Sequence, residues 1–242
     1  MDGFRLRPLM NACVLLAKGF RRWRRARAGA EGAHNGEMLR RHLLRGGPMA
    51  AVCMLGSGLF AEEAAPRRAL RVLFIGNSYT YLNNLPKLLE AIAASEKGGP
   101  AIHTEASLSG GKTLKWHWEQ GRAVEAIRKG GWDFVVLQEM STLGDQGPKG
   151  GPPRIHDPAM YFEYAGRFHK EIQKTGAKTA LYATWARDGY PEQQRRLDDA
   201  FVQFARKSKA GIVPAGLAWT VAKLEAPGIR LHMPDRSHPT LA

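Results

Sequence analysis

The sequence predicts an α/β protein whose parallel sheet lies between helical layers. From Arg71 onward, short apolar runs alternate with segments of helical spacing. The clearest runs, such as 72–75, are continuously apolar, as expected for strands that are covered on both faces. Strands that alternate with helices favour right-handed crossovers. We therefore expect a three-layer α/β/α sandwich with a parallel sheet of about five strands.

Glycine and proline mark the ends of most of these segments. Pro86 stands where a helix should begin, and Gly176 where another should end. The clearest central strand is the apolar run 134–138. In chain order we expect strands at 72–75, 102–107, 134–138, 179–184 and 211–213, and helices at 86–96, 114–129, 158–175, 191–209 and about 217–224.

The first 61 residues differ in composition from the rest of the chain. The 242 residues include 36 Lys and Arg against 22 Asp and Glu, a formal net charge of +14. Eleven of the basic residues precede position 62, and the remainder of the chain has a net charge of +6. The basic pI is therefore largely a property of the N-terminus. The cluster of arginines at 21–25 is also compatible with an RNA-binding arm, which is the alternative interpretation of this region.

Residues 38–61 have the order of a secretory signal peptide. A basic segment at 38–45 precedes an apolar run at 48–60, and a small residue then stands before two glutamates. The apolar run is too short to span a bilayer. We interpret 1–37 as a basic, disordered tail or upstream extension, 62–69 as a linker and 70–242 as the domain. The expected product is secreted or periplasmic, with no membrane span after signal removal and no nucleic-acid partner.

A serine, a histidine and an aspartate near the two ends of this domain could form a nucleophilic triad. The first strand leads into a tight turn that presents Ser78, and Asp235 stands three residues before His238. Alone, each pattern is more often a helix cap or an ordinary turn. Together they supply a hydroxyl, a base and an orienting acid. Their order along an α/β pattern favours a hydrolase.

Three short blocks resemble the SGNH, or GDSL-like, hydrolase superfamily. They are Gly76-Asn77-Ser78, Leu108-Ser109-Gly110-Gly111 and Asp235-Arg236-Ser237-His238. The resemblance covers about 71–240 and is to a divergent, carbohydrate-esterase-like branch. It implies a flavodoxin-like sheet, with Ser78 as nucleophile, His238 as general base and then acid, and Asp235 as its orienter. It also implies that the backbone amides of Ser78 and Gly111 face the developing oxyanion.

The chain departs from the family pattern at three places. Asn77 replaces the usual Asp beside the nucleophile. The third block carries no Asn, so we expect the amide of Gln138 to complete the oxyanion hole, with Ser141 as the other candidate. The chain also stops four residues after His238, where the family adds a helix, so we expect weaker packing behind the histidine.

Other residues at the predicted strand ends could contact a substrate. We assign possible substrate binding to Asn77, Gly110 and Trp185, the last by stacking on a sugar. The loop 141–157, rich in Gly and Pro, is a candidate rim or lid. No cofactor is required by this chemistry, and we predict no metal site because the remaining histidines lack ligand spacing with carboxylates.

One motif favours a different class of protein. Residues 106–113 nearly match a phosphate-binding loop, in which Gly111, Lys112 and Thr113 would hold a nucleotide and its magnesium ion. Its first glycine is replaced by alanine, and no Asp ends a later apolar strand. A non-catalytic carbohydrate-binding relative of the same fold is a further alternative.

The main hypothesis is an exported serine esterase that hydrolyses small acyl esters, acetyl esters on carbohydrates above all.

Overall fold

The computed structural model describes residues 68–144 and 153–241. The expected tail, signal peptide and most of the linker lie outside the described residues. Five parallel strands form one sheet in the order β2-β1-β3-β4-β5. The strands are β1 (Leu70–Gly76), β2 (Ile102–Leu108), β3 (Phe134–Leu137), β4 (Lys178–Tyr182) and β5 (Gly211–Val213). The prediction of a parallel, five-stranded sheet is confirmed.

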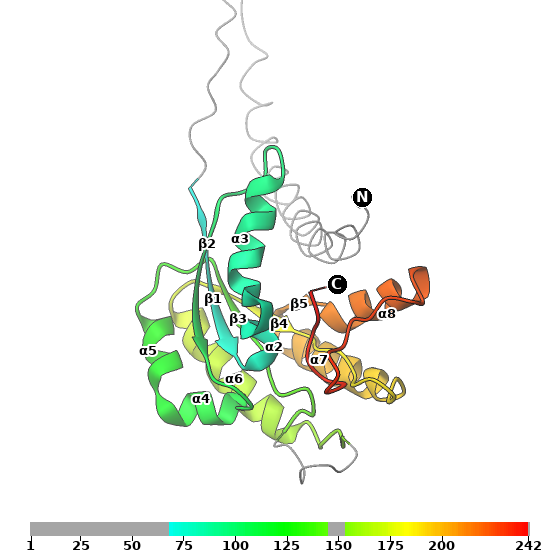
Figure 1. Cartoon of the computed structure of the whole chain (residues 1–242). Helices are drawn as coiled ribbons and strands as arrows, with labels where there is room; N and C mark the ends of the chain where they lie inside the picture. The colour runs from blue at the N-terminus through cyan, green and yellow to red at the C-terminus, as the bar shows by residue number, and fades with distance from the viewer. Residues whose placement is uncertain (1–67, 145–152, 242) are drawn as a thin grey trace, which may run out of the picture. The chain divides into compact units, whose positions relative to one another are not determined.

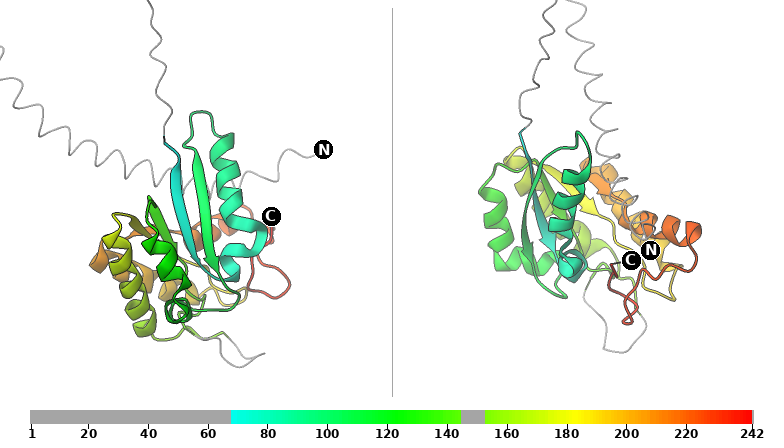
Figure 2. Two further views of the ribbon diagram at one scale, coloured as in Figure 1. Left: turned by 90° about the vertical axis from the view of Figure 1, so that its left-hand side faces the viewer. Right: turned by 45° about the horizontal axis from the view of Figure 1, so that its top comes forward.

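Helices cover both faces of the sheet, which gives the three expected layers. They are α2 (Ser78–Tyr81), α3 (Leu85–Ser95), α4 (Leu114–Gln120), α5 (Arg122–Arg128), α6 (Ala159–Lys174), α7 (Gln193–Ser208) and α8 (Ala215–Glu225), with a 3₁₀ turn at Leu82–Asn84. The two views in Figures 1 and 2 place α3 on the opposite side of the strands from α5 and α6.

One expected helix is wrong in its extent. The segment 114–129 forms two helices rather than one, because the chain changes direction at Gly121. Gly121 adopts φ +79°, a conformation that glycine reaches without steric cost, and its N–H donates to the carbonyl of Trp118 to end α4. The break lets α5 run along the sheet while α4 stays near the carboxyl end of β1.

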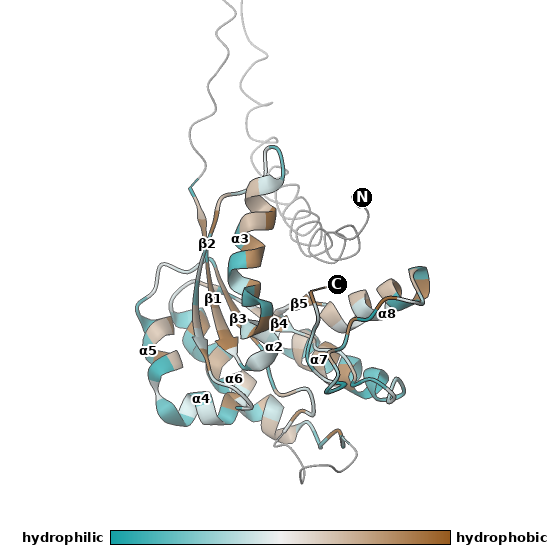
Figure 3. Cartoon of the chain, viewed as in Figure 1, coloured by the Kyte–Doolittle hydropathy of each residue, from teal (hydrophilic) through white to brown (hydrophobic). Residues whose placement is uncertain are grey.

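The main core lies between the sheet and the helices α5, α6 and α7. Leu73, Ile75 and Leu137 are fully buried on this face of the strands, and they belong to the same apolar cluster as Phe168 and Phe201 of the covering helices. Figure 3 shows the hydrophobic residues concentrated on the strands, with hydrophilic residues on the outer side of α7. Burial of these continuous apolar runs accounts for the pattern that predicted the fold.

Candidate active site

The carboxyl ends of the central strands bring the predicted site residues to one edge of the sheet. Gly76 at the end of β1 is level with Leu108 of β2, and Ile75 is level with Leu137 of β3. Ser78, Gly111 and Gln138 each follow one of these strand ends. In parallel α/β sheets this edge is where ligands bind.

Ser78 and His238 meet there, although 160 residues separate them. The Oγ atom of Ser78 lies 2.7 Å from Nε2 of His238. On the other side of the ring, Nδ1 of His238 lies 2.5 Å from Oδ2 of Asp235. The segment that carries His238 lies beside α2, whose first residue is Ser78 (Figure 1). A hydroxyl, an imidazole and a carboxylate thus form one continuous hydrogen-bonded line.

The environment of Asp235 fixes which nitrogen of His238 carries the proton. Partial burial alone would raise the pKa of Asp235, but hydrogen bonds from the His238 ring and from the backbone N–H groups of His238 and Ser237 lower it to about 2. The carboxylate is therefore ionised at neutral pH and only accepts. Its partner Nδ1 must donate, which leaves the lone pair of Nε2 free to accept the Ser78 proton.

A network of buried amides holds Ser78 in place. The backbone N–H of Asn77 donates to Oε1 of Gln138 at 2.8 Å, and Nε2 of Gln138 donates back to Oδ1 of Asn77 at 2.9 Å. The Asn77 side chain also accepts from the Tyr79 N–H, so that it caps α2, and donates to the carbonyl of Lys112. Gly76 is required here, because a Cβ would lie 2.5 Å from Oε1 of Gln138.

In this network Gln138 and Asn77 have roles that differ from the expected oxyanion donor and substrate contact. Both N–H groups of the Gln138 side chain are used, by Oδ1 of Asn77 and by the carbonyl of Glu139 at 2.6 Å. Gln138 and Asn77 are each only 1% exposed. The Gln138 amide therefore has no proton left for an oxyanion, and Asn77 does not face a substrate. Both residues position the Ser78 turn instead.

The backbone N–H groups of Ser78 and Gly111, the two amides expected to face an oxyanion, have no acceptor within the described parts of the chain. Gly111 has φ +65°, and the place of its missing Cβ is open space. A left-handed glycine turn of this kind points N–H groups outward. Gly110, also exposed, comes close to the ring of Tyr81, since a Cβ on it would meet the Tyr81 hydroxyl at 2.8 Å.

Aromatic rings support the segment that carries His238. The ring of Tyr79 lies edge-on to that of His238, with centroids 5.5 Å apart, and its hydroxyl is 2.6 Å from Oγ of Ser237. Trp185 stacks on Tyr79 at 4.7 Å and on Trp219 at 4.0 Å, and its indole N–H donates to the carbonyl of Ser237. The support joins residues from four separate parts of the chain.

The expectation that Trp185 stacks on a sugar is corrected by this arrangement. Trp185 is 2% exposed, and both of its faces are covered by other rings. Sequence reasoning also missed Tyr79 and Ser237. Their positions directly after Ser78 and directly before His238 were the available signal, because neighbours of reacting residues often orient them.

Known structures share this architecture. No family model and no curated protein sequence matches the chain. Among solved structures, a putative SGNH hydrolase from Slackia heliotrinireducens is similar with a TM-score of 0.57 and 24% identity, covering 72% of this chain and 91% of that one. The chain has the SGNH hydrolase fold. The acetyl xylan esterase AlAXEase is similar with a TM-score of 0.54 and 13% identity, over 71% of this chain and 92% of that one.

A third similar structure is a catalytic mutant of Axe2, an acetylxylan esterase from Geobacillus stearothermophilus. Its TM-score is 0.51 at 14% identity, and the match covers 71% of this chain and 87% of that one. These identities are low, so the likeness concerns the SGNH hydrolase fold. It confirms the flavodoxin-like architecture that the three sequence blocks implied.

Within the SGNH hydrolase fold, the phosphate-loop-like residues have structural contacts of their own. Oγ1 of Thr113 accepts from the N–H of Trp116 and so caps α4. The Lys112 ammonium lies over the Trp116 ring, 5.5 Å from its centroid, and the Lys112 carbonyl accepts from Asn77. The buried imidazole of His117 lies 2.8 Å from the carbonyl of Gly76, which ties α4 to the end of β1.

The predicted loop 141–157 is described only at its two ends. Ser141 and Thr142 are buried next to β3, and the carbonyl of Thr142 accepts from the N–H of His156. Oγ of Ser141 is buried and has no hydrogen-bond partner among the residues described. The middle of the loop, 145–152, lies outside the described residues, so its role as a rim or lid stays a prediction.

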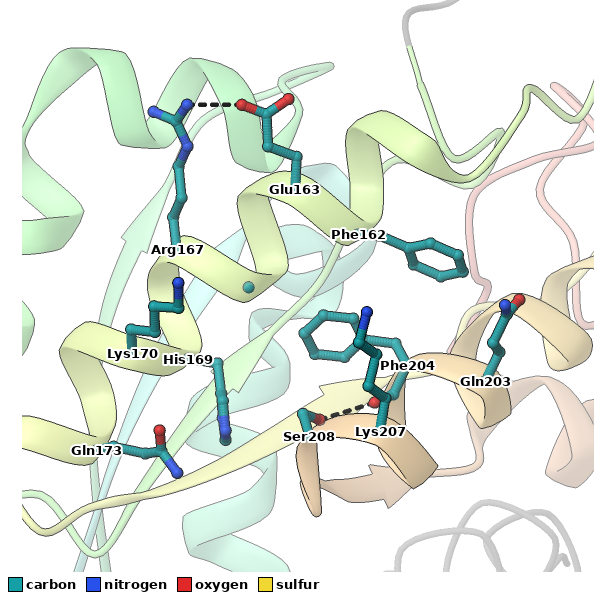
Figure 4. Close-up of a pocket in the computed structure, with 11 residues that line it drawn as sticks. Phe162, Glu163, Arg167, His169, Lys170, Gln173, Gln203, Phe204, Lys207 and Ser208 are labelled. Carbon is teal, nitrogen blue, oxygen red and sulfur yellow. Dashed lines mark hydrogen bonds and ion pairs between the residues drawn. The ribbon is translucent and has the colours of Figure 1, made fainter.

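A surface groove of about 700 Å³ lies elsewhere, between α6 and α7 (Figure 4). Phe162 and Phe204 line it together with the basic side chains Arg167, Lys170 and Lys207. None of the predicted site residues lines it. Within 68–144 and 153–241 there is no group of three or more His, Cys, Asp or Glu side chains placed to hold a metal ion. In the same residues no helix combines the length and the apolar character that crossing a membrane requires.

Proposed function

We propose that this protein is an exported serine esterase that hydrolyses small acyl esters, acetyl esters on carbohydrates above all. The observation that carries the proposal is the line of contacts from Ser78 Oγ through both nitrogens of His238 to Asp235. The same fold occurs in proteins described as acetyl xylan esterases, which favours this substrate class. The export rests on the composition of 38–61 alone.

The reaction begins with proton transfer from Ser78 to His238. As Oγ of Ser78 attacks the ester carbonyl carbon, Nε2 of His238 takes the hydroxyl proton and the ring becomes an imidazolium. Asp235, ionised and hydrogen-bonded to Nδ1, stabilises this positive charge. The carbonyl π electrons move to oxygen, which becomes an oxyanion. The backbone N–H groups of Ser78 and Gly111 are the donors offered to it.

Collapse of the tetrahedral intermediate releases the alcohol. The imidazolium of His238 gives its proton to the leaving oxygen, and the acyl group stays on Oγ of Ser78 as an ester. A water molecule then enters, loses a proton to Nε2 and attacks the acyl carbon. The Oγ–acyl bond then breaks and the imidazolium returns its proton to Oγ, so that the carboxylic acid leaves and Ser78 and His238 are restored. The amide network of Asn77 and Gln138 does not touch the reacting atoms and serves to keep Ser78 in line.

Hydrolysis of 4-nitrophenyl acetate tests the proposal. Wild-type protein should release 4-nitrophenol, and Ser78→Ala and His238→Ala should each lower kcat by about 10³-fold or more with the circular dichroism spectrum unchanged. Mass spectrometry should detect an acetyl group on Ser78 of the wild type during turnover. Lys112→Ala serves as a control and should keep its activity. Equal turnover by wild type and Ser78→Ala would remove Ser78 from the mechanism.

A further inference from the structure

Glu139 is a buried carboxyl group that takes no part in the proposed proton transfers. It stands two residues after the end of β3, and its side chain is 0% exposed. Both of its oxygens accept from backbone N–H groups, Oε2 from Leu114 at 3.1 Å and Oε1 from Met140 at 2.6 Å. Moving a carboxyl group out of water costs free energy that an apolar side chain of the same size would avoid. The contact to Leu114, distant in the sequence, therefore calls for an explanation.

Leu114 is the first residue of α4, and the loop before it carries Gly111. The N–H groups of the first turn of a helix have no acceptor within the helix. Glu139 supplies the acceptor for Leu114, so that it fixes the start of α4 to the end of β3. Gly111, whose N–H is offered to the oxyanion, lies only three residues before this contact.

The other end of the same loop is tied to the turn of the nucleophile. The N–H of Ser109 donates to the carbonyl at the end of β1 at 3.0 Å, and the carbonyl of Lys112 accepts from the Asn77 side chain at 2.9 Å. Gly111, at φ +65°, has no side chain to anchor it. The direction of its N–H therefore depends on the residues that hold the loop on either side, of which Leu114 is the last.

Two consecutive residues after β3 thus hold the two oxyanion donors. Gln138 accepts from the N–H of Asn77 and holds the Ser78 turn, whereas Glu139 holds α4. Neighbouring side chains of an extended chain point to opposite faces, which lets adjacent residues reach different elements. The Gln138 side chain also donates to the carbonyl of Glu139 at 2.6 Å, which links the two supports. Two donors act on one oxyanion only if both lie about 2.7–3.1 Å from it.

We propose that Glu139 is a positioning residue of the oxyanion hole: by holding the first N–H of α4, it fixes the N–H of Gly111 opposite that of Ser78. The inference rests on the proposed esterase function and adds to that site a residue that does not touch the substrate. Negative charge develops on the carbonyl oxygen only after attack by Ser78. Glu139 therefore contributes to the rate of reaction and not to the affinity for the ester.

Glu139→Gln tests the inference with a side chain of the same shape. Either orientation of the new amide sets its NH₂ group against an N–H, that of Leu114 or that of Met140. We expect kcat for 4-nitrophenyl acetate to fall by about 10–100-fold while KM changes by less than about twofold, because a displaced donor costs less than a removed one. Methylboronic acid, which forms a tetrahedral adduct on Ser78, should bind more weakly by a similar factor.

Asp133→Asn is the matched control. Oδ2 of Asp133 also accepts from a backbone N–H, that of Arg71 at 2.8 Å, but at the amino-terminal edge of the sheet. This variant should lose stability while kcat and the affinity for methylboronic acid stay unchanged. Wild-type kcat in Glu139→Gln would overturn the inference, and so would an equal fall of kcat in both variants or a fall accompanied by an equal rise in KM.

Amide hydrogen exchange of the segment 109–114 separates this inference from the esterase proposal. If the wild type hydrolyses no ester, the esterase proposal fails, and exchange then decides the role of Glu139. Exchange in this segment should be about tenfold faster or more in Glu139→Gln than in the wild type and in Asp133→Asn. Equal exchange in all three would overturn the inference. If Glu139→Gln does not fold, Glu139→Asp, which reaches toward Leu114 with one methylene less, takes its place in every measurement.

Discussion

Ser78 and His238 reach their shared hydrogen bond from two supports that differ in kind. The turn that carries Ser78 is held in place by the side-chain amides of Asn77 and Gln138, which are buried and hydrogen-bonded to each other. His238 is on an irregular segment whose support consists mainly of stacked rings, Tyr79, Trp185 and Trp219. The side chains of His238 and Asp235 remain 26% and 46% exposed.

The two supports should respond differently to change. A buried amide network requires every donor and acceptor to be matched, so one wrong atom leaves a buried polar group unpaired or two oxygens in contact. Ring stacking is less directional, and a somewhat different ring can fill the same space. The nucleophile side should therefore be intolerant of isosteric polar changes. On the base side, exchanges among the stacked rings should lower function gradually, whereas the directional contact of Asp235 with His238 should be as intolerant as the amide network.

The largest expected effect comes from Asp235→Asn, which tests the polar contact on the base side. The backbone N–H groups of Ser237 and His238 hold one oxygen of this side chain, so the amide NH₂ of an asparagine would face Nδ1 of His238. Nδ1 would then have to accept, and the ring proton would move to Nε2, where it blocks proton transfer from Ser78. We expect kcat for 4-nitrophenyl acetate to fall by about 10³–10⁴-fold.

Asp199→Asn, on the exposed side of α7, is the control for that change and should be neutral. The fold of both variants is compared by thermal unfolding. A loss of less than tenfold in Asp235→Asn would show that the aspartate does not set the tautomer of His238.

Asn77→Asp should have the next largest effect, on stability. An aspartate at this place cannot donate to the carbonyl of Lys112, and its second oxygen would lie against that carbonyl in a buried site. We expect the free energy of unfolding to fall by about 2–4 kcal/mol, measured by urea denaturation at pH 7. The same substitution at the exposed Asn84 should change it by less than about 0.5 kcal/mol. Equal stability of the two variants would contradict the idea that the buried amide network requires every donor and acceptor to be matched.

That network also shows where the sequence was informative and where it was not. The continuous apolar runs at 72–75 and 134–138 predicted the strands correctly. A strand that is buried on both faces consists of consecutive apolar residues, and this pattern is visible in the sequence itself. The order of Ser78 and His238 along an α/β pattern predicted that they could meet. These inferences depend on chain order and on strand ends, which topology fixes.

The orientation of individual side chains could not be read in the same way. Gln138 looked like a donor to substrate because its residue type is right and it ends a strand, but Asn77 and Glu139 use both of its N–H groups. Trp185 follows a strand and looked available for a sugar, but Tyr79 and Trp219 cover its faces. Each assignment depends on partners distant in sequence, which spacing does not reveal.

Trp185→Phe should produce a smaller, graded effect on the base side. Phenylalanine keeps a ring between Tyr79 and Trp219 but leaves the carbonyl of Ser237 without its indole donor. Loss of such a hydrogen bond costs about 1–3 kcal/mol, part of which should appear as a roughly tenfold fall in kcat at unchanged KM.

Trp132→Phe is the matched control, because its indole N–H also donates to a backbone carbonyl, that of Ala126, away from the triad. It should lose stability by a similar amount while kcat stays the same. Similar kcat values for the two variants would show that the stack serves the fold alone and does not position His238.

The smallest expected effect is a pH-dependent contribution of Asp235 to stability. Its pKa in the folded protein is about 2, below the ordinary 3.8, so the ionised form stabilises the fold. This stabilisation is complete above pH 4 and is lost as the pH falls from 4 toward 2. Because the side chain is half exposed, solvent screening keeps it below about 1 kcal/mol. Urea unfolding from pH 6 to pH 2.5 should show the difference in unfolding free energy between wild type and Asp235→Asn shrinking over that window.

Glu90 provides the control, because hydrogen bonds from Lys87 and Thr104 also lower its pKa to about 2. Glu90→Gln should show the same pH dependence of stability but no loss of esterase activity at pH 7. If the stability difference between wild type and Asp235→Asn stays constant with pH, the Asp235 carboxylate makes no net favourable contribution to the stability of the fold. Its contact with His238 would then matter for catalysis only.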